Sequence, residues 1–136
     1  MPFVRRITDS IDGKAPLKYV SGAEVAKDVV IDYSTVSTDT WGRRLVVKGE
    51  VLCRITASGK YGPYSTSASD GRQTISAPSS GTIQTVVAAE DADVQLGNKG
   101  IGGWYHNCVF DYSELTRHSA GRSSLEDAFP TSTFDD

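Results

Sequence analysis

Apolar residues recur at every second position in two stretches of the chain, residues 45–56 and residues 104–110. In the first stretch, Val51, Cys53 and Ile55 face one side, and Leu52, Arg54 and Thr56 face the other. In the second stretch, Trp104, His106, Cys108 and Phe110 alternate with Tyr105, Asn107 and Val109. A period of two is typical of a β-strand whose two faces meet different surroundings. The first stretch is therefore predicted as a half-buried strand, and the second as another clear strand.

Weaker patterns predict a β-rich domain whose strands are joined by turns. Residues 25–33 are a candidate strand, although a short helix is also compatible with them, and residues 82–87 form another strand after Gly81. Residues 56–74 contain glycine, proline and the pair Asp70-Gly71 but no apolar run. This composition predicts a long loop that is rich in turns.

The C-terminal part of the chain predicts a short helix followed by a tail. Ser123 and Glu126 have the spacing of a capping box, in which each residue satisfies a backbone N–H of the other. Pro130 is expected to end this helix within about two turns. Residues 131–136 are then predicted as a short tail.

The N-terminal residues 1–20 follow neither the helical nor the strand period. Their apolar and basic residues include Phe3, Val4, Arg5, Arg6, Ile7 and Ile11. This pattern predicts a flexible extended arm at 1–20 ahead of a β-rich domain at 21–136. An ordinary frayed terminus is the alternative interpretation.

Composition and charge narrow the class of protein. A chain of 136 residues with 13 glycines and five prolines predicts one ordinary domain with many turns, or one smaller domain with a tail. The formal charge of −3 argues against direct binding of nucleic acid, which usually requires a basic face. The charge is uneven, +3 over residues 1–60 and −6 over residues 61–136, which suggests electrostatic docking onto a partner or simply a solvated surface. No run of about 18 apolar residues predicts a membrane span, and the N-terminus lacks the apolar core of a signal peptide.

The sequence offers little catalytic chemistry. His106 shares a strand face with Cys108, but a zinc site needs at least three suitable ligands, and the other candidates are scattered. The glycines between Gly97 and Gly103 fit neither a phosphate-binding loop nor a dinucleotide fingerprint. We therefore expect no enzyme activity, no catalytic residue, no metal and no cofactor. We expect Cys53 and Cys108 to be buried, reduced thiols, with a single disulfide as the alternative if the two strands that carry them are neighbours.

The stretch "KGEVLCRITASGKYGPYSTSASDGRQT", residues 48–74, resembles the core motif of lambda-type head decoration proteins of tailed bacteriophages. The matching positions are Gly49, Val51, Leu52, Ile55, Thr56, Ser58, Gly59, Lys60, Tyr61, Ala68, Asp70 and Gly71. The chain departs from this pattern at Cys53, where the family usually has glycine. The resemblance covers about a third of the chain well and about two thirds loosely.

The resemblance implies a mainly β domain, a small sandwich or barrel (β-tulip-like) with short helices and an extended N-terminal arm. It implies a homotrimer on the outer surface of the virion capsid, made in the host cytoplasm, that binds the major capsid protein of the expanded head. As a cement protein, such a trimer holds the shell against the pressure of packaged DNA. Phe3, Val4, Arg5, Arg6, Ile7 and Ile11 would then belong to the capsid-binding arm, and Gly59, Lys60, Tyr61, Tyr64, Asp70 and Gly71 to a possible trimer or capsid interface.

Two other interpretations remain open from the residues alone. The first is another phage virion β-module, a tail or fibre domain that binds a host glycan or a partner protein. Its aromatic platform would be Trp41, Trp104 and Tyr105, exposed together on one surface. The second is a small enzyme or metal-binding domain built around His106 and Cys108. Tyr61 and Tyr64 could also pack within their own domain instead of at an interface.

Overall fold

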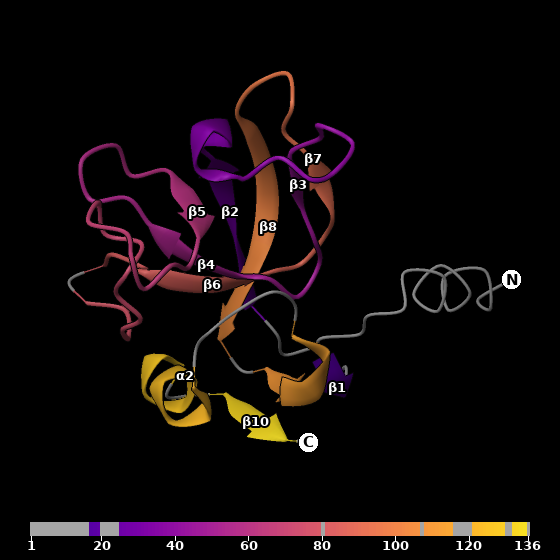
Figure 1. Cartoon of the computed structure of the whole chain (residues 1–136). Coiled ribbons are helices and arrows are strands. Elements are labelled where there is room, and N and C mark those ends of the chain that lie inside the picture. Colours follow the sequence, from indigo (N-terminus) through magenta and orange to yellow (C-terminus); the bar gives the residue numbers. More distant parts are fainter. Residues whose placement is uncertain are drawn as a thin grey trace, which may run out of the picture.

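A closed barrel of five strands forms the centre of this mainly β protein (Figure 1). The computed structural model describes residues 17–19, 25–79, 81–106, 108–115, 121–129 and 132–135. Around the barrel the strands follow the order β2 (Val25–Ile31), β5 (Tyr61–Pro63), β4 (Val51–Arg54), β6 (Thr85–Ala88) and β8 (Lys99–His106). The expected class, a mainly β barrel-like domain with short helices, is confirmed.

Smaller elements surround this barrel. A three-stranded sheet has the order β1 (Leu17–Tyr19), β9 (Val109–Asp111) and β10 (Thr133–Asp135), and a two-stranded sheet pairs β3 (Leu45–Val46) with β7 (Ala92–Asp93). The helices of the described chain are the 3-10 turns η1 (Tyr33–Thr35) and η2 (Tyr112–Glu114) and the α-helix α2 (Arg122–Ala128). Figure 1 shows α2, β10 and β1 gathered at one end of the barrel and η1 at the opposite end.

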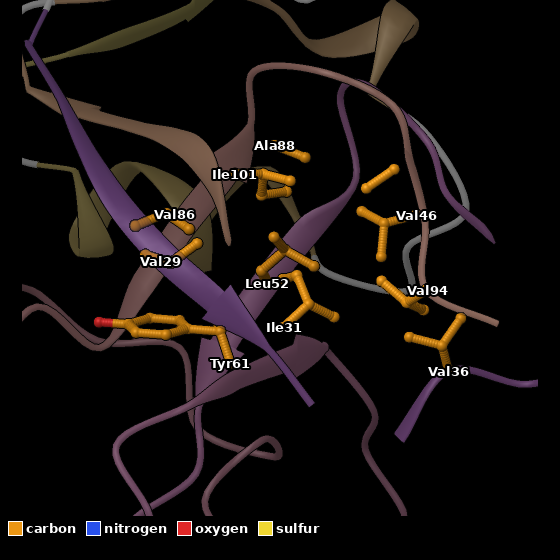
Figure 2. Packing of buried hydrophobic residues seen from close by; sticks show 11 residues of the cluster. Val29, Ile31, Val36, Val46, Leu52, Tyr61, Val86, Ala88, Val94 and Ile101 are labelled. Carbon is orange, nitrogen blue, oxygen red and sulfur yellow. The ribbon is translucent and has the colours of Figure 1, made fainter. Parts of the chain in front are cut away.

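The first of two cores fills the inside of the barrel (Figure 2). Alternate residues of a barrel strand point inward, so each strand contributes every second side chain. These inward residues include Val29, Ile31, Leu52, Tyr61, Val86 and Ile101. Val36, Val46 and Val94 extend this core to the two-stranded sheet.

The second core lies between the outside of the barrel and the C-terminal elements. Val51 and Val87 point outward from paired positions of β4 and β6 and pack in this cluster. Three phenylalanines form its aromatic centre, with ring centroids 4.9 Å apart for Phe110 and Phe134 and 5.7 Å apart for Phe129 and each of the others. Such ring pairs stabilise a core beyond the area that they bury.

The strand at residues 51–54 is therefore buried on both faces, and its prediction as half-buried was wrong. The alternation is present, since Leu52 packs inside the barrel and Val51 packs outside it. The outward face is covered because elements distant in sequence pack over it. The strand predicted at residues 104–110 is also divided, because β8 ends at His106 and β9 begins at Val109 in a different sheet.

The loop predicted at residues 56–74 contains a barrel strand. Residues Tyr61–Pro63 form β5, which pairs antiparallel with β4 and parallel with β2 through Ile31 and Tyr61. A strand of three residues containing glycine and proline carries no readable period. Its conformation depends on its two neighbours in the barrel.

The C-terminal segment also differs from its prediction. Helix α2 begins after Gly121 rather than Ser123, and Gly121 provides no side-chain cap, so the capping box does not form. The predicted tail contains β10, which runs parallel to β9 and buries Phe134. The helix is short, as expected from Pro130, which itself lies outside the described residues.

The N-terminal segment joins the domain before residue 20. Leu17–Tyr19 form β1, which pairs antiparallel with β9 of the domain's own sheet. The predicted arm, residues 1–20, therefore includes three residues that belong to the β-rich body. The remainder of the predicted arm, with Phe3, Val4, Arg5, Arg6, Ile7 and Ile11, lies outside the described residues.

We predict that Gly103→Ala destabilises the barrel whereas Gly100→Ala does not. A Cβ atom at Gly103 would lie 2.6 Å from Cγ2 and 2.8 Å from Cβ of Val86 inside the barrel, whereas a Cβ at Gly100 meets only the Val29 carbonyl oxygen at 3.8 Å. Overpacking of this kind costs about 1–3 kcal/mol. Urea unfolding of the two variants measures the difference, and equal midpoints would show that the interior accommodates the extra methyl group.

Candidate functional site

The residues of the Gly59–Tyr64 stretch were candidates for an interface, and the structure places its central tyrosine in the core. Tyr61 is 3 % exposed, and its hydroxyl donates a hydrogen bond to the carbonyl oxygen of Ile83. Burial raises the pKa of Tyr61 above its ordinary value. Figure 2 shows the hydroxyl pointing away from the rest of the apolar cluster. Tyr61 therefore packs within its own domain, and Tyr64 packs partly buried against the second core.

Glycines in this region allow close approach between segments. A Cβ atom at Gly62 would lie 2.2 Å from the Thr35 hydroxyl oxygen and 2.8 Å from Cδ of Arg72. Gly71 has a φ of +118°, and a Cβ there would lie 2.6 Å from the Arg54 carbonyl oxygen. Both positions need glycine because the neighbouring chain occupies the space of a side chain.

Asp70 and Arg72 lock the turn that contains Gly71. Nε of Arg72 lies 3.0 Å from Oδ2 of Asp70, and Nη1 of Arg72 donates to the Pro63 carbonyl oxygen at 3.3 Å. Burial favours the neutral carboxyl of Asp70, but hydrogen bonds from the backbone and side chain of Arg72 outweigh this effect and lower its pKa. Asp70 thus positions Arg72, and Arg72 connects this turn to Pro63 of β5.

Sequence reasoning missed Gln84, which ties the same turn to the barrel. Its Nε2 donates to the carbonyl oxygens of Gly71 at 2.9 Å and Arg54 at 3.2 Å. The Thr56 backbone N–H also donates to the Asp70 carbonyl oxygen, at 2.9 Å. No local pattern marks Gln84, because its partners are 13 and 30 residues away along the chain.

A groove of about 510 Å³ lies at the mouth of the barrel beside this scaffold. Its lining comes from β2, the end of β4, the turn at residues 58–60 and the segment 81–83. Three basic side chains, Lys27, Arg54 and Lys60, and one carboxylate, Asp28, line it together with the hydroxyl-bearing Ser58 and Thr82. Lys60 was predicted as a site residue, whereas Lys27 and Arg54 were not.

Exposed apolar side chains occur in η1, in the turn before β3 and in the loop between β7 and β8. Trp41 is 79 % exposed and Leu96 fully exposed, and Tyr33 in η1 is 42 % exposed. The backbone N–H of Tyr33 donates to Oδ1 of Asn98, and the Arg44 guanidinium lies 5.5 Å from the centre of the Tyr33 ring. Figure 1 shows η1 and the β7–β8 loop at the same end of the barrel. Exposed large apolar side chains of this kind are candidates for contact with another protein.

The aromatic platform considered for glycan binding is not assembled. Trp104 and Tyr105 are half-buried, and both pack against the second core, whereas Trp41 is exposed in the turn before β3. The three rings therefore do not share one exposed surface.

The thiol and metal chemistry of the described chain is limited. Cys53 and Cys108 are free and buried, as expected. Within the described residues, no three His, Cys, Asp or Glu side chains are grouped in a way that could hold a metal ion. The side chain of His106 lies outside the described part.

Cys53, where the resembling family usually has glycine, fills space in a strand that is buried on both faces. Its sulfur lies 3.8 Å from the hydroxyl oxygen of Thr85 on the neighbouring strand. Burial raises the pKa of the Cys53 thiol to about 12, although the Thr85 hydroxyl and the Arg72 charge act in the opposite direction. Cys53 pairs with Gly62 of β5 and with Thr85 of β6 within the antiparallel ladders of β4.

Comparison of the chain with models of known protein families, with curated protein sequences and with solved structures gave no match. Among the described helices, none has the length and apolar character needed to cross a membrane.

We predict that stability falls as the pH rises from about 9 to about 12, and that Cys53→Ala reduces this fall. The unfolded thiol releases its proton near its ordinary pKa of 9.0, whereas the folded thiol keeps it to about 12. The contribution of Cys53 to the free energy of unfolding is therefore complete below pH 9. Above pH 9 it falls by up to about 1.4 kcal/mol for each pH unit. Urea unfolding at several pH values measures the free energy of unfolding of the unmodified protein and of the Cys53→Ala variant. Identical pH profiles for these two proteins would contradict the prediction.

Proposed function

We propose that this protein is a bacteriophage capsid decoration (cement) protein that binds as a homotrimer to the major capsid protein of the expanded head. One observation carries the proposal. Three residues of the resemblance hold the closing part of the barrel: Tyr61 completes the core, Gly71 permits close packing, and Asp70 positions Arg72. Because these motif residues have a structural role, they support a relation to the family that the motif resembles.

The shape of the body supports a mechanical role. Two cores share β4 and β6, so the barrel and the C-terminal elements are packed as one unit. Trp41 and Leu96 offer exposed apolar contact area, and interfaces are enriched in aromatic side chains. Strand β1 lies at an edge of its sheet and connects this body directly to residues 1–16.

In this proposal the N-terminal residues hold the shell and the body covers it. A polar segment with spaced apolar residues can add to the edge of a partner's sheet, where main-chain hydrogen bonds supply affinity. Ordering such a segment costs about 2–5 kcal/mol. A trimer presents three segments at once, so each later one binds at a high effective concentration.

We predict that deletion of residues 1–16 abolishes binding to expanded phage heads and leaves the trimer folded. The deletion ends before Leu17, because β1 belongs to the body. Light scattering measures the oligomeric state, circular dichroism the fold, and co-sedimentation with expanded heads the binding.

The full-length chain is the control in each measurement. A deletion variant that pellets with heads as the full-length chain does would contradict the role of the segment. A full-length chain that is monomeric and does not pellet would contradict the decoration function itself. Glycan binding by the full-length chain in the same preparation would instead favour a tail or fibre module.

A further inference from the structure

We propose that the groove at the barrel mouth binds an extended acidic peptide segment of a partner protein, which adds as a strand to the free edge of β2. This inference concerns residues other than those of the N-terminal segment. It does not depend on the proposed function, although an acidic strand of a shell subunit would suit both.

The charge of the groove favours an acidic occupant. Lys27 and Arg54 follow the inward-facing parity of Val29 and Leu52, so both belong to the barrel mouth, and Lys60 joins them from the adjacent turn. Among the described residues, no carboxylate lies within salt-bridge distance of these three side chains. Asp28 is the one carboxylate among the described residues of the lining, so this part of the groove is positive in a protein whose net charge is negative.

The backbone beside the groove favours a strand. β2 pairs with β8 at all seven of its positions, from Val25 to Ile31, but with β5 only at Ile31. Within the described chain, no strand covers the part of this edge that precedes Ile31. Unpaired strand edges are templates for another chain, and the edge lies in the groove because Lys27, Asp28, Val29 and Val30 line it.

The side chains along this edge suit an alternating peptide. Val30 is 44 % exposed and offers apolar contact next to the basic residues. In strand addition the backbone supplies affinity while alternate side chains select the sequence. A peptide that alternates acidic residues with small or β-branched ones can use both features. A nucleic acid or a sulfated glycan could use the charges but not the backbone edge.

The first experiment measures binding of a fluorescein-labelled peptide of alternating threonine and glutamate to the full-length protein by fluorescence anisotropy. Lys27→Glu and Lys60→Glu are each expected to weaken binding about tenfold, because each reverses a charge at the groove. Lys99→Glu is the control, matched in exposure to Lys27, because Lys99 is exposed but lies outside the lining. Circular dichroism checks that each variant is folded.

Three results would overturn the proposal. The first is a loss of peptide affinity in the Lys99→Glu control equal to that in the groove variants. The second is equal affinity for a peptide of alternating threonine and lysine. The third is absence of binding by the unmodified protein at low salt, where charge attraction is least screened.

A second experiment tests strand addition. Amide chemical shifts of the ¹⁵N-labelled protein are expected to change over residues 26–30 and 58–60 when the peptide is added. A peptide with N-methyl groups on alternate residues should lose binding, because it lacks the main-chain donors. Undiminished binding of that peptide would overturn strand addition, and stronger binding of a heparin oligosaccharide in competition would assign the groove to a glycan.

Discussion

The contact between Ile31 and Tyr61 is the constraint on which the barrel depends. It is the single pair that joins β2 to β5, and β5 has three residues. The Asp32 backbone N–H donates to the Tyr61 carbonyl oxygen at 2.9 Å, and the Tyr61 ring fills the core on the inner side. Closure at this one point also leaves the rest of the β2 edge beside the basic groove.

The short closing strand is held by contacts from outside it. The Ile55 backbone N–H donates to the Lys60 carbonyl oxygen at 2.7 Å, which connects β4 to the residue before β5. Arg72 reaches the Pro63 carbonyl oxygen from the Asp70-Gly71 turn, and Gln84 fixes that turn to the barrel. Glycine at positions 62 and 71 lets these segments approach closely. The motif residues therefore act together as a scaffold, although they look like a loop along the chain.

This arrangement separates scaffold from contact surface. Tyr61 and the two crowded glycines are occupied by internal packing, whereas Trp41 and Leu96 are exposed and Lys60 lines the groove, so these three side chains are available for contact with a partner. The decoration function that we propose would use this division, because the body would resist deformation while exposed groups and N-terminal residues bind. The second core serves the same purpose, because Phe110, Phe129 and Phe134 pack the C-terminal elements onto the outside of the barrel.

The sequence by itself determined the β class, the alternation at residues 51–54 and the two buried thiols, and it indicated a candidate strand at residues 25–33, of which residues 25–31 form β2, because periodicity and composition are local properties. Of the basic groove it identified Lys60 alone. Tertiary structure decided that residues 61–63 are a strand, that β4 is covered on both faces, and that Lys27 and Arg54 meet at one barrel mouth. These features arise from contacts between residues far apart along the chain. A local sequence pattern does not predict which distant side chain will pack over a strand or lie near a charged group.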